Sequence, residues 1–198
     1  MTRTVSPKSV ALARVISWIG HPLVFVTICV TIVLGSTTSV RTGWPVLLGL
    51  FLSVIAPTAL LLYLGVRSGR WKDADVSVRQ ERRSFYHWAI PISALGLLTM
   101  WWIKAPSFVL RGGLTTFGML ILAALINRFF KISLHAIFAG YCAIILCAVG
   151  WGVGVAAVLL ALASFWSRLV LRRHSVAEVI AGGLLGILGG IFAAWIPF

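Results

Sequence analysis

The sequence predicts an all-α membrane protein, a polytopic transmembrane helical bundle with six or seven membrane-spanning helices. Composition is the first reason, because 60% of the 198 residues are hydrophobic and only 11% are charged, which leaves too little polar surface for a water-soluble globule. The second reason is that the apolar residues gather in runs near the roughly 20 residues that a helix needs to cross a bilayer. No repeat or change of composition marks a second domain, so residues 1–198 are expected to form a single integral membrane domain.

The chain contains seven apolar runs, which are the candidates for membrane-spanning helices. They cover residues 15–34, 45–64, 85–103, 113–130, 133–150, 151–170 and 176–196. The first follows three basic residues, as the apolar part of a signal peptide does, but it is long and lacks a clear Ala-x-Ala cleavage site, so we expect an uncleaved helix. The fourth and fifth runs are short for a crossing, which is why the expected number is six or seven.

The connections between these runs set the topology. Residues 67–84 form the one long polar loop and hold three of the four acidic residues of the chain. The Gly150-Trp151-Gly152 sequence leaves almost no connection between the fifth and sixth runs, which predicts a tight antiparallel hairpin. Counting the crossings places the polar loop, residues 131–135 and residues 167–174 on the same side of the membrane. These three polar segments are therefore expected to build one pocket.

The formal net charge of +13 indicates anionic partners. Because the basic residues lie at the ends of the apolar runs, where side chains meet the headgroups of membrane lipids, nucleic acid is not expected as a partner. All of them except Arg41, Lys104 and Arg111 fall on the side that carries the three polar segments. The positive-inside rule then places this side in the cytoplasm, and the small size of the chain suits a prokaryotic inner membrane.

The most informative segment lies between the last two apolar runs. Ser167 and Arg168 are followed by His174, and Glu178 comes four residues after this histidine. If His174 opens a helix, Glu178 lies one turn along on the same face and can orient the imidazole. Arg168 offers the forked donors that suit phosphate oxygens. A glutamate at this place can also serve simply to cap the start of the helix.

The three polar segments resemble the signature motifs of the type 2 phosphatidic acid phosphatase superfamily. The third motif of that family reads Ser-Arg, five residues, His, three residues, Asp, and Glu178 stands here at the place of the Asp. The second motif, Pro-Ser-Gly-His, corresponds to Ile132-Ser133-Leu134-His135. The first motif, Lys, six residues, Arg-Pro, corresponds to Lys72 followed by Arg79-Gln80. The motifs occur in the order of the family, and they span residues 72–178.

The resemblance implies a phosphatase that works through a phosphohistidine. His174 would attack the phosphorus, Glu178 would hold the other ring nitrogen of His174, and His135 would protonate the leaving oxygen. The phosphate would lie in a cradle of basic and hydroxyl side chains, formed by Lys72, Arg79, Arg82, Ser133 and Arg168. For Arg82, contact with lipid headgroups is the alternative role. The expected substrate is a lipid-linked phosphate or diphosphate, such as phosphatidate, a prenyl diphosphate or a polyprenyl-phosphate sugar derivative.

No metal or cofactor is expected for this chemistry. A phosphatase that uses divalent ions supplies several carboxylates, yet outside the polar loop the only acidic residue is Glu178. The same shortage argues against a CDP-alcohol phosphotransferase or a prenyltransferase. The three cysteines lie inside apolar runs without metal-ligand spacing, so we expect them to be buried.

Several residues near these motifs are expected to have structural roles. Arg172 and Arg173 suit anchoring at the membrane interface. His21, next to Pro22, and His87 lack a carboxylate at helical spacing and are expected to pack or to lie at the interface. The glycine-rich stretch 182–190 predicts close packing between helices.

Two rival functions stay open from the sequence. A phosphotransferase on the same fold would pass the phosphoryl group to a lipid or sugar hydroxyl in place of water. A channel or transporter would use His174, Glu178 and Arg168 to line an ion path, with no turnover.

Overall fold

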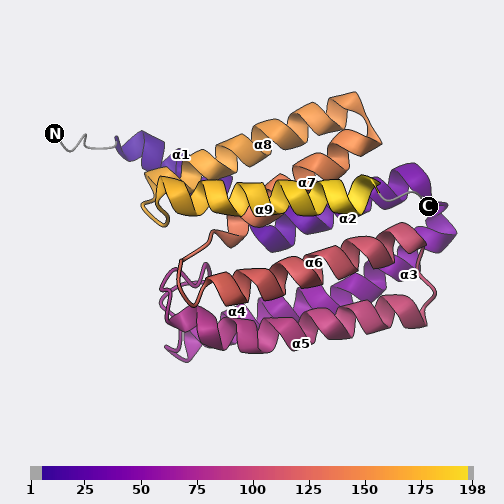
Figure 1. Ribbon diagram of the computed structural model, residues 1–198, viewed down its shortest axis with the longest axis horizontal. Helices are drawn as coiled ribbons and strands as arrows, with labels where there is room; N and C mark the ends of the chain where they lie inside the picture. Colours follow the sequence, from indigo (N-terminus) through magenta and orange to yellow (C-terminus); the bar gives the residue numbers. More distant parts are fainter. Residues whose placement is uncertain (1–5, 196–198) are drawn as a thin grey trace. The chain divides into compact units, whose positions relative to one another are not determined.

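The computed structural model describes residues 6–195, and this part of the chain is helical with no β-strand (Figure 1). The elements are α1 (Pro7–Ile19), α2 (Pro22–Thr37), α3 (Val40–Leu50), the π-helical segment η1 (Phe51–Ile55), α4 (Ala56–Arg67), α5 (Glu81–Trp102), α6 (Ser107–Ile126), α7 (Leu134–Val149), α8 (Trp151–Val170) and α9 (Val176–Trp195). The all-helical prediction is therefore confirmed over the described residues.

Four helical spans within residues 6–195 are long and apolar enough to cross a membrane. They are Val40–Arg67, Ser107–Ile126, Trp151–Val170 and Val176–Ala194, and α1 with α2 adds a fifth if the bent pair is one span. α7 is apolar but shorter than these. Several long apolar helices thus fit a membrane-embedded protein, while the number of six or seven crossings stays a prediction.

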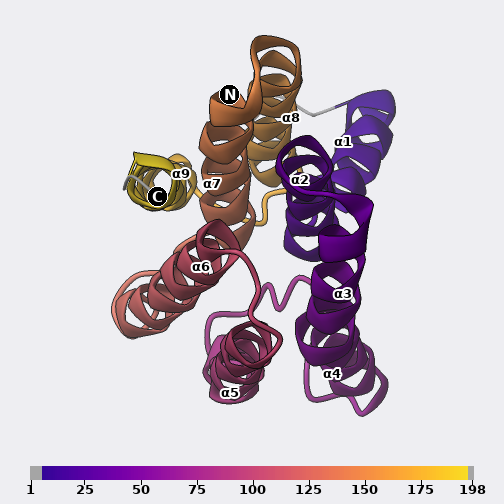
Figure 2. The same ribbon diagram turned by 90° about the vertical axis from the view of Figure 1, so that its right-hand side faces the viewer.

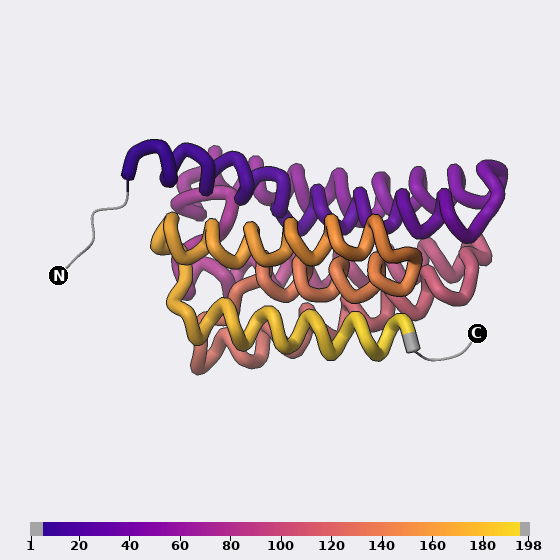
Figure 3. Tube along the Cα trace, turned by 90° about the horizontal axis from the view of Figure 1, so that it is seen from above, coloured from indigo at the N-terminus to yellow at the C-terminus, as the bar shows by residue number. Residues whose placement is uncertain are grey.

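The first predicted span, 15–34, is wrong as a single helix. α1 ends at Ile19 and α2 begins at Pro22, and the two are bent by 51° at the break between them (Figure 3). The reason is local, because Pro22 has no main-chain N–H with which to continue α1 beyond Gly20. The residue before a proline also avoids the helical region, so His21 lies outside both helices.

Serine side chains mark the start of several helices. Ser6 caps α1, Ser39 caps α3 and Ser133 caps α7, each by accepting a hydrogen bond from the main-chain N–H three residues later. Such a cap satisfies one of the donors that a helix start leaves open.

The described chain divides into two compact units, each with its own packing. The first holds residues up to 29 together with residues 132–194, and the second holds residues 30–131. α1, α7, α8 and α9 therefore belong to the first unit, and α3 to α6 belong to the second. The prediction that the chain is one domain stays a prediction.

In the first unit, α7 and α8 form the antiparallel hairpin that Gly150 was expected to permit. α7 ends at Val149, α8 begins at Trp151 and the two pack along each other, with α1 packed on α8 (Figure 2). α9 lies against α7 so closely that a Cβ on Gly186 would stand 2.0 Å from the Ile137 carbonyl oxygen. The predicted close packing of the glycine stretch is confirmed at this position.

In the second unit, α5 packs against α3, α4 and α6. A small core of buried side chains is formed by Leu34 at the end of α2, Val46 on α3, Met100 on α5 and Ala105 just after α5. η1 ends two residues before Pro57, which offers no N–H to the Ser53 carbonyl, and this missing bond explains the wider turn of the backbone there.

Candidate active site

The turn after α8 fixes the direction in which the chain leaves Arg168. The main-chain N–H of Arg173 donates to the Arg168 carbonyl at 3.0 Å, and that of Arg172 donates to the Leu169 carbonyl at 3.0 Å. Arg172 has a φ of 51°, so this is the left-handed residue of a Schellman motif. The motif reverses the chain and carries it from the end of α8 to His174 and the start of α9.

His174 and Glu178 are in direct contact. Nδ1 of His174 lies 2.7 Å from Oε2 of Glu178, and the two side chains are 3% and 18% exposed. The expectation that Glu178 lies within reach of the imidazole is therefore confirmed. A carboxylate at Nδ1 fixes the ring and stabilises a positive charge on it.

Glu178 also caps the helix in which it lies. Its carboxylate accepts from the Ser175 N–H at 3.3 Å, while the Ser175 hydroxyl accepts from the Glu178 N–H at 3.3 Å. This reciprocal pair is a capping box, for which Ser-x-x-Glu is the sequence signal. Both interpretations of Glu178 are thus present in the geometry, and Ser175 is a residue that the sequence reasoning missed.

The second motif meets the third through the main chain. Ser133 is fully buried, its hydroxyl accepts from the Ala136 N–H at 3.3 Å, and its own N–H donates to the Glu178 carbonyl at 3.3 Å. The starts of α7 and α9 are therefore joined directly. His135 is the second residue of α7 and follows Ser133 by two positions, and its side chain is buried.

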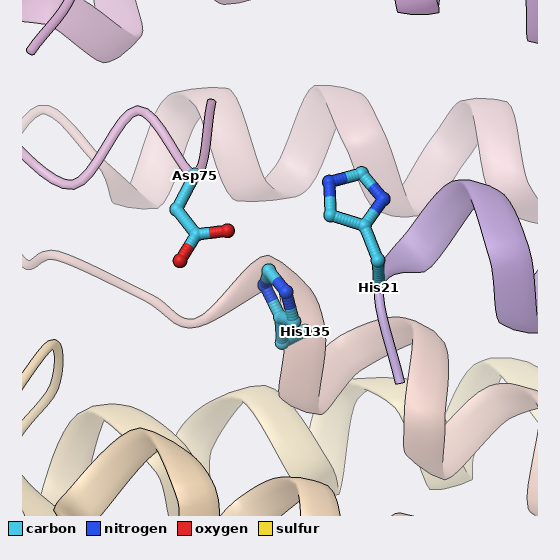
Figure 4. A group of neighbouring side chains, drawn as sticks. All are labelled: His21, Asp75 and His135. Carbon is cyan, nitrogen blue, oxygen red and sulfur yellow. The ribbon is translucent and has the colours of Figure 1, made fainter. Parts of the chain in front are cut away.

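His135 packs against His21 from the break between α1 and α2 (Figure 4). The ring centroids are 5.3 Å apart and the planes stand at 89°, an edge-to-face arrangement. Nδ1 of His21 accepts from the Leu23 N–H at 3.3 Å. His21 was expected to pack or to lie at the interface, and it packs against a candidate catalytic residue, which no spacing in the sequence indicates.

Arg168 is buried on α8, with 1% of its surface exposed. One of its terminal nitrogens donates to the hydroxyl of Ser17 on α1, which is itself buried. Ser17 was not among the sequence candidates, because it lies in the first apolar run and far from Arg168 along the chain. Burial of a guanidinium is costly unless its donors are used, and the Ser17 hydroxyl meets part of that need.

The candidate residues of the first motif lie in the second unit, on a loop that is held by its own contacts. The Trp71 ring packs so closely on Gly65 that a Cβ there would lie 2.1 Å from Cε3 of the ring. Nε1 of Trp71 donates to the Ser84 hydroxyl at 2.8 Å, and the Lys72 N–H donates to the Glu81 carboxylate at 3.1 Å. The Lys72 residue itself is exposed. Trp71, the one aromatic residue of the 67–84 loop, is the anchor that the sequence reasoning passed over.

Arg79 and Arg82 both use their guanidinium groups on main-chain carbonyls. Nε of Arg79 donates to the Asn127 carbonyl at 2.9 Å and a terminal nitrogen donates to the Arg128 carbonyl, just after α6. Asn127 returns a bond from its side-chain amide to the Arg79 carbonyl at 3.3 Å. Arg82 is buried, and its Nε donates to the Val76 carbonyl at 3.0 Å. Both arginines thus order the loop around them.

Five of the sequence candidates belong to the first unit, namely Ser133, His135, Arg168, His174 and Glu178. Hydrogen bonds join three of them, His174 to Glu178 and Ser133 to Glu178. Lys72, Arg79 and Arg82 belong to the second unit, so their share in a common pocket stays a prediction. Comparison with protein-family models, curated proteins and solved structures finds no match to this chain.

Proposed function

We propose that this chain is a membrane lipid phosphatase of the type 2 phosphatidic acid phosphatase superfamily, one that hydrolyses a phosphomonoester or diphosphate on a lipid or isoprenoid. The observation that supports it best is the 2.7 Å contact between His174 Nδ1 and Glu178 Oε2. Because the carboxylate engages Nδ1, the nucleophilic atom of the proposal is Nε2. The spacing of Ser167, Arg168, His174 and Glu178, which resembles that of the family, is the second support.

The reaction has two displacement steps. In the first, Nε2 of His174 forms a bond to phosphorus in line with the bond that breaks to the leaving oxygen, and His135 gives that oxygen a proton. In the second, a water molecule gives a proton to the now neutral His135 and attacks the phosphohistidine, the P–N bond breaks and inorganic phosphate leaves. Glu178 stabilises the positive charge that His174 carries while phosphorylated.

The remaining candidate residues are proposed to neutralise the negative charge of the phosphate. A phosphoryl group in transfer spreads negative charge over its equatorial oxygens, and fixed cations lower the barrier by meeting that charge. Arg168 supplies this from the end of α8, next to the turn that leads to His174. Lys72, Arg79 and Arg82 complete the cradle in the proposal, with the Ser133 hydroxyl at the start of α7.

The membrane setting of the proposal follows from the apolar helices and the charge pattern. The protein crosses a prokaryotic inner membrane with six or seven helices, its active site faces the cytoplasm, and the apolar tail of the substrate enters between helices while the headgroup meets the basic residues. No metal or other cofactor takes part.

The decisive experiment is a substrate panel assayed for released phosphate. Purified protein in detergent is given phosphatidate, a prenyl diphosphate and a polyprenyl diphosphate, and the wild type is compared with His174→Ala. We expect His174→Ala to lose on the order of 10³-fold or more in kcat, as removal of a nucleophile does. His87→Ala is the matched control, because His87 is an exposed histidine on α5 and belongs to no motif.

The outcomes separate the rival functions. Retention of phosphate release by His174→Ala contradicts the proposal. Transfer of phosphate to an added acceptor alcohol, in place of release to water, identifies a phosphotransferase. Ion flux in liposomes without turnover of any lipid identifies a channel or transporter.

A further inference from the structure

We infer that residues 17–21, at the break between α1 and α2, form a fourth part of the active site, in which Ser17 orients Arg168 and His21 positions His135. The inference rests on the proposed phosphatase and goes beyond its three motifs. All four side chains belong to the first unit. Ser17 and His21 are positioning residues here, since each acts through a residue of a motif.

Ser17 acts on the phosphate-binding arginine. Arg168 is almost fully buried and one of its terminal nitrogens donates to the Ser17 hydroxyl. A guanidinium has five N–H donors in one rigid plane, so a bond at one terminal nitrogen restricts where the other donors can point. A hydroxyl acceptor does this without adding a negative charge beside a group that must bind an anion.

His21 acts on the proton donor. Its own ring is held by the Leu23 N–H, which donates to Nδ1, and a neutral imidazole that accepts at Nδ1 carries its hydrogen on Nε2. The ring then stands at 89° to the His135 ring with 5.3 Å between the centroids. A catalytic side chain must be held to within about 0.5 Å by neighbours that are themselves fixed, and His21 meets that description for His135.

Gly20 lets this segment approach α8. A Cβ on Gly20 would lie 2.8 Å from the Ser164 hydroxyl oxygen, closer than side chains pack, although its backbone dihedrals suit any residue. The direction of the chain changes by 51° between α1 and α2. Ser17 precedes Gly20 in the sequence and His21 follows it, so both lie close to this bend. The break is therefore built so that one short segment reaches both Arg168 and His135.

Ser17 is tested through phosphate affinity. Ser17→Ala is expected to raise KM and the inhibition constant of inorganic phosphate by about tenfold, as loss of a bond to a charged group does, with a smaller change in kcat. In an Arg168→Ala background the same substitution is expected to add nothing. Ser17→Thr keeps the hydroxyl and should restore affinity. Ser36→Ala removes an exposed hydroxyl that bonds only within α2, and it serves as the control.

His21 is tested through the leaving group. An alkoxide must be protonated as it departs, whereas p-nitrophenolate leaves without a proton. His21→Ala should therefore lower kcat on a lipid phosphate roughly 10- to 100-fold while changing hydrolysis of p-nitrophenyl phosphate much less. His135→Ala should show the same dependence on the leaving group, and the double variant should be no slower than His135→Ala alone.

The two levels of the proposal fail in different ways. If the wild type releases phosphate in a manner that depends on His174, yet Ser17→Ala and His21→Ala keep wild-type KM, kcat and leaving-group dependence, residues 17–21 are not part of the site and the phosphatase stands. If no lipid is turned over by the wild type, both fall. Should Ser17→Ala fail to fold, Ser17→Cys keeps the volume with a poor acceptor and must weaken phosphate inhibition for the inference to hold.

Discussion

The main-chain N–H of Ser133 donates to the main-chain carbonyl of Glu178 at 3.3 Å, which joins the second motif to the third without any side chain. Just beyond this bond, a Cβ on Gly182 would stand 2.6 Å from the Ser133 carbonyl oxygen. The first turns of α7 and α9 are thus held at the distance of direct backbone contact. His135 and His174 are carried by elements that share this junction, so its packing bears on the geometry of both.

Gly186→Ala tests the close approach of α7 and α9. The added methyl group would meet the Ile137 carbonyl, which is main chain and cannot turn aside. We expect the free energy of unfolding in detergent to fall by about 1–3 kcal/mol, as overpacking does. Gly118→Ala on α6 is the control, because nothing lies within 4 Å of its Cβ and alanine favours the helix. Equal stability of the two variants would contradict the packing described here.

Glu178→Gln separates the capping role of this residue from its role in catalysis. Glutamine can still complete a capping box, so thermal stability should stay near that of the wild type. It cannot offset a positive charge on His174, and we expect kcat for phosphate release to fall by on the order of 10²-fold or more. Ser175→Ala should show the reverse, a loss of about 1 kcal/mol in stability with activity largely kept. If both variants lose stability while kcat stays at the wild-type value, Glu178 serves only as a helix cap.

Arg79 is expected to stabilise the second unit even without substrate. Its guanidinium bonds to the carbonyls of Asn127 and Arg128, and Asn127 bonds back to it. Arg79→Ala should therefore lower the free energy of unfolding by roughly 1–3 kcal/mol, measured by thermal unfolding of the substrate-free protein. Asn127→Ala should lower it by about 1 kcal/mol. Arg83→Ala, which removes an exposed arginine of the same loop region, should leave stability unchanged.

Activity should survive the removal of divalent ions. Only four acidic residues are present, and Glu178 is already engaged by His174 and Ser175. Phosphate release in excess EDTA is therefore expected to equal release in Mg²⁺. Strict dependence on a divalent ion, restored on adding it back, would be incompatible with a phosphohistidine mechanism that uses these residues alone.

Local patterns in the sequence were enough to place much of the fold. Residues 151–170 form the expected helix, α9 begins at the expected Val176, and the hairpin at Gly150 is present. The contact between His174 and Glu178 follows from their separation of four residues, although His174 lies before the cap residue Ser175 and not in the first turn of α9. Each of these depends only on residues that are neighbours along the chain, which is the range over which periodicity and capping act.

The contacts that the sequence did not indicate join distant segments. Ser17 meets Arg168 and His21 meets His135 because α1 packs on α8 and stops at Gly20, and no periodicity encodes which helices become neighbours. The break itself was missed because the length of the apolar run outweighed Gly20 and Pro22, two residues that end and restart a helix. Trp71 was passed over for a similar reason, since its burial depends on Gly65 in another element.

Arg172→Gly should stabilise the protein and leave its chemistry intact. Arg172 holds a φ of 51° in the Schellman motif after α8, a conformation that costs a residue with a Cβ about 1–2 kcal/mol and glycine almost nothing. The greater freedom of glycine in the unfolded chain offsets part of this relief of strain. We therefore expect a net rise of roughly 0.5–1 kcal/mol in the free energy of unfolding. Arg172 is exposed and has no place in the proposed cradle, so KM and kcat should not change. Arg173→Gly, whose φ is not positive, should destabilise instead, and a fall in phosphate affinity on Arg172→Gly would show that this arginine binds substrate after all.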